Sequence, residues 1–197
     1  MEEKDKIPKN LITIWIGGEM PQVVRECEKS HYLSGYNRIH INNDNYYHCK
    51  YVDECVAAGK FGKACDYLRM YYLDVYGGIY IDMDTKIIKP FDDVLDNVMF
   101  TCEEENQFIA NGIIGSVADH PMIKEYIRIV ETNFIGGGDL VFQPGMYLWT
   151  ELVKYSKWSP DVKIYPADWF LPYNHQNKQT NITENTHTYH YYLKSWK

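Results

Sequence analysis

The feature that most constrains the fold is a helix that ends in two glycines and leads directly into a short apolar strand. From Phe61 to Tyr76, apolar side chains recur at helical spacing. Gly77-Gly78 ends this helix, because glycine accepts the backbone conformation that follows a last helical turn. The next three residues, Ile-Tyr-Ile at 79–81, form a short apolar run typical of a buried strand. A helix that leads into a buried strand is typical of α/β domains.

The rest of the chain continues this alternation. Apolar, β-rich runs predict further strands at 11–16, 38–42, 86–88, 98–102, 108–115, 163–166 and 188–193. Helices are expected from residue 21 through the twenties, from 120 to about 133, and from 144 to about 155, with a glycine break at 136–138. The stretch between 166 and 188 is polar and loop-like. We therefore expect one α/β domain over 1–197, with a central mixed, mostly parallel sheet flanked by helices.

Charge and composition limit the partners. The formal net charge of −7 argues against nucleic acid, which requires basic surfaces. The N-terminus is charged, and no run approaches the roughly 18 apolar residues of a transmembrane span. Five cysteines without CxxC pairing suit reduced thiols better than disulfides or zinc. We expect a cytoplasmic protein; a peripheral membrane association stays open.

Two carboxylates follow the predicted strand directly. Asp82 and Asp84 flank one residue at the carboxyl end of that strand, where α/β sheets bind their ligands. Carboxylates at this spacing can converge on one hard cation. A solvated acidic turn is the alternative, since an Asp-x-Asp sequence is common by itself.

The preceding helix adds a charged pair. Asp66 and Arg69 lie three residues apart and therefore share a face. An exposed ion pair of little consequence is the ordinary interpretation. However, the pair lies among Ala64, Leu68 and Tyr72, on the face expected to pack against the sheet. A bound sugar diphosphate would explain charges there, with Arg69 binding a phosphate and Asp66 binding sugar hydroxyls.

These two segments resemble a known family. The sequence Ala-Cys-Asp-Tyr-Leu-Arg at 64–69, followed by Tyr-Gly-Gly-Ile-Tyr-Ile-Asp-Met-Asp at 76–84, is similar to the DXD region of glycosyltransferase family 32. That family includes capsule-type transferases and mannosyltransferases, and the clostridial glucosylating toxins share its core. Cys65 stands where the family has serine. The resemblance implies a GT-A, Rossmann-like fold and transfer of a sugar from a nucleotide diphosphate.

The resemblance extends to both ends of the chain. It implies that Trp15, Ile16 and Gly17 receive the nucleotide base and that Asn111 faces the sugar or the acceptor. It also implies that His190 binds the metal, and that Ser195 and Trp196 close on the diphosphate. Without the resemblance, Trp15 would be a core residue, Asn111 a turn cap and His190 ordinary packing. Tyr191 replaces a second histidine of the family, and Gln-Pro-Gly at 143–145 replaces its usual Thr-Gly-Pro.

The implied reaction is metal-dependent. Mn²⁺ or Mg²⁺ between the carboxylates and the phosphates would act as a Lewis acid on the leaving group. Asp84 would be the main ligand, Asp82 would bridge the metal and hydroxyls of the ribose or donor sugar, and Arg69 would add positive charge near the phosphate. The resemblance implies retention of anomeric configuration, either through a covalent carboxylate intermediate or through same-face attack by the acceptor, and we favour same-face attack. The expected enzyme moves a sugar, from a UDP-sugar by preference, to a saccharide acceptor in polysaccharide or glycoconjugate synthesis, such as that of a capsule.

Three alternatives remain at this point. Asp82-Met83-Asp84-Thr85 also fits a haloacid-dehalogenase-type phosphatase with Asp82 as nucleophile and Asp84 as general acid. That motif would normally open the first strand, and it leaves Asp66 and Arg69 unexplained. A non-catalytic sugar-binding module is the second alternative, and a transferase that modifies proteins is the third.

Overall fold

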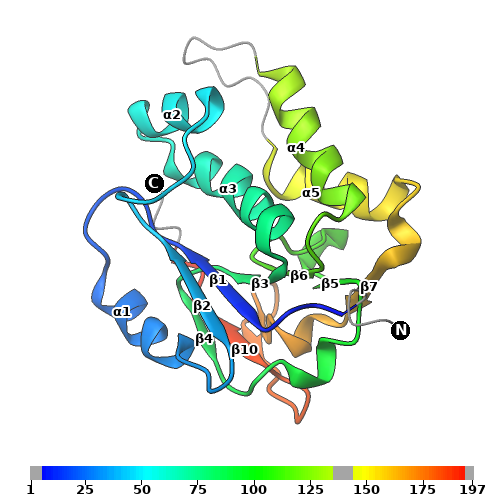
Figure 1. The fold of residues 1–197 in the computed structure, drawn as a ribbon. Helices are drawn as coiled ribbons and strands as arrows, with labels where there is room; N and C mark the ends of the chain where they lie inside the picture. The colour runs from blue at the N-terminus through cyan, green and yellow to red at the C-terminus, as the bar shows by residue number, and fades with distance from the viewer. Residues whose placement is uncertain (1–5, 135–143, 194–197) are drawn as a thin grey trace.

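A six-stranded sheet forms the centre of the computed structural model, which describes residues 6–134 and 144–193 (Figure 1). Its order is β2-β1-β3-β6-β5-β7, with bounds β2 Asn37–Ile41, β1 Asn10–Ile14, β3 Gly78–Ile81, β6 Ile113–Ser116, β5 Met99–Cys102 and β7 Val162–Tyr165. Strand β1 runs parallel to β2 and β3, and β5 parallel to β7, whereas β6 is antiparallel to both neighbours. The expected mixed, mostly parallel sheet is confirmed.

Helices α2 Lys50–Ala57, α3 Phe61–Tyr76, α4 Pro121–Asn133 and α5 Gly145–Tyr155 gather over one face of this sheet, and α1 Gln22–Glu28 lies to the side (Figure 1). Short 3₁₀ turns join the elements at η2 Lys29–His31, η3 Asp92–Val94, η4 Glu105–Gln107, η5 Ser159–Asp161 and η6 Ala167–Trp169. None of the helices in the described ranges is long and apolar enough to cross a membrane.

The strand residues alternate between two cores. Ile12 and Tyr80 pack with the four helices in one hydrophobic cluster. Leu11, Ile79 and Ile81 point the other way, into a second cluster under the sheet. This period of two is the ordinary pleat of a strand buried on both faces. It places Asp82, two residues beyond Tyr80, on the side of α3.

Two small antiparallel ladders complete the fold. Strand β4, Thr85–Ile87, pairs with β10, Thr188–His190, so that His190 lies opposite Thr85. Strands β8, Tyr173–Asn174, and β9, Gln179–Thr180, form a hairpin. The β4–β10 ladder therefore brings the end of the chain beside the two aspartates.

The sequence-based elements agree closely with the structure over most of the described residues, although the strand expected at 188–193 ends at His190. The helix expected at 61–76 has those bounds. Helix α2 was not expected, the strand expected at 108–115 begins only at Ile113, and the stretch expected to be loop contains the β8–β9 hairpin. The glycine break predicted at 136–138 lies outside the described residues.

Candidate active site

Asp82 and Asp84 lie where β3 ends and the chain turns into β4. The amide of Asp82 donates to the Gly112 carbonyl at 2.9 Å, and the amide of Thr85 donates to the Asp82 carbonyl at 3.0 Å. The turn is thus tied both to itself and to the loop before β6. Asp84 is buried, and Asp82 is partly exposed. Both carboxylates are therefore held in fixed positions at the carboxyl edge of the sheet.

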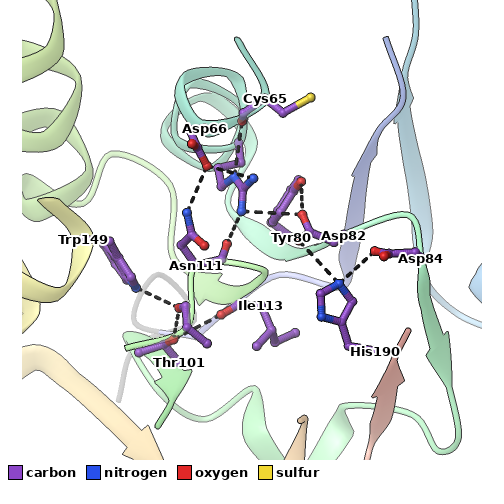
Figure 2. A network of polar contacts seen from close by, with 12 residues as sticks. Cys65, Asp66, Tyr80, Asp82, Asp84, Thr101, Asn111, Ile113, Trp149 and His190 are labelled. Carbon is purple, nitrogen blue, oxygen red and sulfur yellow. Dashed lines mark hydrogen bonds and ion pairs between the residues drawn. The ribbon is translucent and has the colours of Figure 1, made fainter. Parts of the chain in front are cut away.

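His190 completes a group of three possible metal ligands. One ligand atom each from Asp82, Asp84 and His190 lies within 4.8 Å of the others. His190 Nε2 is 2.8 Å from Asp84 Oδ1 and 3.8 Å from Asp82 Oδ2 (Figure 2). Two carboxylates and one imidazole form a donor set that suits Mn²⁺ or a similar divalent cation. The residues present therefore fit the metal that the sequence implied.

Asp84 and His190 shift each other's pKa in opposite directions. Burial alone would raise the pKa of Asp84, but hydrogen bonds from His190 and from the Leu193 amide at 2.9 Å outweigh it, so the pKa lies below its ordinary value. Burial alone would lower the pKa of His190, but the hydrogen bond and charge of Asp84 raise it above the ordinary value. Asp84 is thus stabilised as an anion, the form that binds a cation.

Arg69 joins α3 to the aspartate turn. Its guanidinium is buried, with Nη2 at 3.0 Å from Asp66 Oδ1 and Nη1 at 3.5 Å from Asp82 Oδ1. Nη1 also donates to the Asn111 carbonyl at 2.5 Å. The expected charged pair on the helix therefore exists, and it is not an exposed surface pair. A buried guanidinium beside two carboxylates is a positive centre fixed next to the candidate metal site.

The loop that carries Asn111 is held in place by hydrogen bonds from Trp149 and Thr101. The Ala110 carbonyl accepts from Trp149 Nε1 at 2.9 Å and from Thr101 Oγ1 at 2.6 Å. Asn111 then points its amide nitrogen at Asp66 Oδ1, at 3.0 Å (Figure 2). Burial raises the pKa of Asp66 to about 6, although Arg69 opposes this shift. A partly protonated carboxyl group at the mouth of a cavity can both donate to and accept from sugar hydroxyls.

Two residues of the site were missed at the level of sequence. Tyr80 donates its hydroxyl to Asp82 Oδ1 at 2.7 Å, and the Arg69 guanidinium lies 4.7 Å from the centre of its ring. The signal was available, since Tyr80 is two residues before Asp82 and therefore shares its side of the strand. Glu104 lines a cavity together with Asp66 and His190, and the pKa of its carboxyl group is raised by burial and by the charge of Asp82, although His190 opposes the shift. Nothing in the spacing of Glu104 pointed to the site.

Two adjoining cavities open on either side of Arg69 and Asp82. The first has a volume of about 330 Å³, and Trp15, Ile16 and Asp84 are among its lining residues. The second has a volume of about 710 Å³, and Asp66, Asn111 and His190 are among its lining residues. Both volumes fall within the order of several hundred Å³ that small-molecule sites occupy. The structure thus places most of the predicted site residues around one pair of cavities.

The residues predicted to bind the nucleotide do not all belong to the described lining of the two cavities. Gly17 is absent from the described lining of both cavities; a Cβ atom there would come within 2.9 Å of the Phe61 ring, so the residue gives that ring room. Trp15 Nε1 donates to the Gly18 carbonyl at 2.9 Å, which fixes the indole at the wall of the first cavity. Ser195 and Trp196 lie outside the described residues.

Comparisons with known proteins agree on one class of enzyme. Residues 26–101 match the family model described as the glycosyltransferase sugar-binding region containing the DXD motif. An uncharacterized glycosyltransferase of Acanthamoeba polyphaga mimivirus is 26% identical over 191 residues, which covers 87% of this chain and 75% of that protein.

Two solved structures are also similar. The PaToxG glycosyltransferase has a TM-score of 0.61 and 18% identity, over 76% of this chain and 68% of that one. A glycosyltransferase involved in the glycosylation of the major capsid of PBCV-1 has a TM-score of 0.49 and 14% identity, over 94% and 95%. The first likeness supports the GT-A fold.

Proposed function

Since the chain carries the sugar-binding region of the DXD glycosyltransferases and is an enzyme of that class, we propose that it is a metal-dependent, retaining transferase. It takes a sugar from a nucleotide diphosphate, UDP by preference, and gives it to a saccharide acceptor in polysaccharide or glycoconjugate synthesis, such as that of a capsule. The observation that carries the proposal is the convergence of Asp82, Asp84 and His190 beside the buried Arg69. The phosphatase alternative is dropped, since the family match is to glycosyltransferases.

The first cavity suits the nucleotide. Trp15 and Ile16 form an apolar wall on which a planar base can pack, and the opposite end carries Arg69 and the two aspartates. The diphosphate would then lie between the Arg69 guanidinium and the carboxylate pair. The planar base thus meets the apolar end of the cavity, and the charged phosphates meet its charged end.

Asp82, Asp84 and His190 would hold the cation, which when bound supplies a Lewis acid for the departing diphosphate. Asp84 is the main ligand in this proposal, because its second oxygen is fixed by the Leu193 amide. Asp82 is held by Tyr80 and Arg69, which orient its carboxylate toward both cavities. Manganese suits the mixed oxygen and nitrogen donors better than magnesium.

The second cavity suits the donor sugar and the acceptor. Asp66 and Asn111 line it and are bonded to each other, so both can bind sugar hydroxyls in a fixed geometry. In same-face attack, the bond between the anomeric carbon and the diphosphate oxygen breaks while the acceptor hydroxyl attacks from the same side. The hydroxyl proton passes to the departing diphosphate oxygen, and Arg69 stabilises the charge that develops there.

We place this reaction in the cytoplasm. All five cysteines of the chain are free, as expected for a compartment that keeps thiols reduced. The partners are then a nucleotide sugar and a saccharide acceptor.

The experiment that tests the proposal is a donor screen. Release of UDP or GDP is measured with a set of UDP- and GDP-sugars, with Mn²⁺, with Mg²⁺ and with a chelator. We expect turnover of at least one UDP-sugar that requires the metal and is lost in Asp84→Asn. The matched control is Asp96→Asn, at an exposed carboxylate paired only with Lys6 in the described structure, which should keep full activity. Metal-independent turnover, or full activity of Asp84→Asn, contradicts the proposal.

A further inference from the structure

A third cavity continues from the second one, away from the nucleotide side. It has a volume of about 430 Å³ and lies between η4 and the β8–β9 hairpin. Glu104, Leu171 and Tyr192 line both the second and the third cavity. The two hollows are therefore neighbours with a common wall, and a ligand longer than one sugar can extend from one into the other.

The lining of the third cavity is rich in carboxamides. Asn174, Asn177, Gln179 and Asn181 all contribute to it. The side-chain oxygen of Asn174 accepts from the amides of residues 176 and 177 at 3.0 Å, and that of Asn177 accepts from the amide of Gln179 at 2.9 Å. Within the described ranges, the side-chain nitrogens of Asn174, Asn177 and Asn181 have no hydrogen-bond partner. The first two are oriented by their own oxygens, and all three are free to donate to a ligand.

The β8–β9 hairpin, which supplies most of these groups, is tied to η4. Glu105 accepts a hydrogen bond from the His175 amide. Gln176 Nε2 donates to Asn106 Oδ1 at 3.1 Å. These two contacts tie η4 to the hairpin. A ligand therefore meets a preformed set of donors, which reduces the entropy lost on binding.

The charge of the cavity defines the ligand further. Its described lining contains Glu104, Glu105 and Asp168 but neither lysine nor arginine. The second cavity, in contrast, is lined by three basic residues, Lys60, Lys63 and Arg69, in addition to its acidic groups. Phosphates and acidic sugars are therefore repelled from the third cavity, whereas a neutral polyol is not.

Tyr192 links this cavity to the metal site. Its ring centre is 4.2 Å from that of His190 on one side and 4.4 Å from that of His175 in the hairpin on the other. Its backbone has a φ of 52°, a left-handed conformation that is uncommon for a residue other than glycine. Backbone outliers of this kind concentrate at ligand sites. The common wall of the two cavities is thus built on the strand end that carries His190.

We infer that the third cavity is an acceptor subsite that binds the second, uncharged sugar of a saccharide whose terminal hydroxyl receives the transferred sugar. The inference rests on the proposed function, because the second cavity is the place of transfer. It adds that the acceptor is at least a disaccharide, and that the sugar next to its terminal sugar is uncharged.

The test compares acceptors of different length with one donor. Transfer is measured to methyl glycosides of glucose, galactose, mannose and N-acetylglucosamine, to neutral disaccharides that end in the same sugars, and to disaccharides with glucuronic acid at the second position. Release of nucleotide to water without acceptor is measured in parallel. Saturation-transfer NMR with the same saccharides reports binding without any donor.

We expect neutral disaccharides to exceed the matching monosaccharides about tenfold in kcat/KM, and to exceed the glucuronic acid analogues by a similar factor that shrinks at high salt. Asn181→Ala should lower transfer to neutral disaccharides about three- to tenfold and leave transfer to monosaccharides and water unchanged. Asp168→Asn should reduce the factor by which kcat/KM for neutral disaccharides exceeds kcat/KM for the glucuronic acid analogues. Asn133→Ala, at an exposed carboxamide near the end of α4, is the matched control and should change nothing.

The outcomes separate the inference from the function on which it rests. Equal transfer to monosaccharides and disaccharides, or no effect of Asn181→Ala on disaccharides, overturns the subsite and leaves the transferase proposal intact. If no donor is turned over, the proposed function fails, and the NMR signals of the disaccharides then decide the subsite alone. Their weakening in Asn181→Ala supports it, and the absence of binding by every saccharide contradicts it.

Discussion

Replacing Asp66 by asparagine should stabilise the folded protein at neutral pH. The carboxyl group lies on α3 between Arg69 and Asn111, with 20% of its side chain exposed. Burial raises its pKa from 3.8 to about 6, which means that the folded state resists its ionisation. An asparagine has nearly the same shape and carries no charge. It therefore removes the free-energy cost of burying an ionised carboxylate, and its side-chain oxygen can still accept a hydrogen bond from Arg69.

The magnitude and the sign follow from proton linkage. A difference of about 2 pKa units corresponds to about 3 kcal/mol, and partial exposure reduces the expected effect to about 1–2 kcal/mol. Between about pH 4 and about pH 6 the folded chain holds a proton on Asp66 that the unfolded chain has released. The contribution of Asp66 to stability therefore falls as pH rises through this window, and the advantage of Asp66→Asn over the wild type should grow across it.

The assay is urea unfolding of both proteins at intervals from pH 4.5 to pH 7.5, without metal. The free energy of unfolding of Asp66→Asn minus that of the wild type should increase with pH and level off above about pH 6. Asp96→Asn, at an exposed carboxylate, is the control and should show no such rise. A difference that stays constant or decreases with pH refutes the reasoning about burial of Asp66.

Three further substitutions test the contacts around the aspartates. Gly112→Ala would bring a Cβ atom within 2.8 Å of Asp82 Oδ2, so we expect Mn²⁺ affinity to fall about tenfold in calorimetry; unchanged affinity would exclude Asp82 as a ligand. Tyr80→Phe removes a hydrogen bond to a carboxylate and should lower the free energy of urea unfolding by about 1.5–3 kcal/mol, whereas a loss below about 0.5 would show that the bond contributes little. Trp15→Ala should weaken UDP binding about tenfold and leave the unfolding midpoint nearly unchanged; equal UDP affinity would place the base elsewhere.

The sequence predicted those parts of the fold whose signals are local. Helix α3 and strand β3 have strong periodic patterns and a glycine pair between them, and both were predicted almost to the residue. Helix α2 lacks a sequence signal because it spans only eight residues and its N-cap, Cys49, makes no capping hydrogen bond. The apolar side chains among residues 108–112 predict a strand, yet these residues pack as an irregular loop held by Thr101 and Trp149.

The site shows the same division. Asp66, Arg69, Asp82 and Asp84 follow from one segment, because strand and helix periodicity fix how their side chains face each other. The contribution of His190 depends on the pairing of β10 with β4, more than a hundred residues apart in the chain, and only the family resemblance pointed to it. The acidic, carboxamide-lined third cavity has no sequence pattern at all, since η4 and the hairpin that form it are brought together by tertiary packing.

The central claim is that a nucleotide diphosphate binds through a cation held by Asp82, Asp84 and His190. The most direct measurement is calorimetric titration of UDP into the purified protein, first with Mn²⁺ and then with a chelator. We expect binding with Mn²⁺ that weakens at least about tenfold when the metal is removed. UDP affinity that is the same with and without Mn²⁺ would contradict a metal site formed by Asp82, Asp84 and His190.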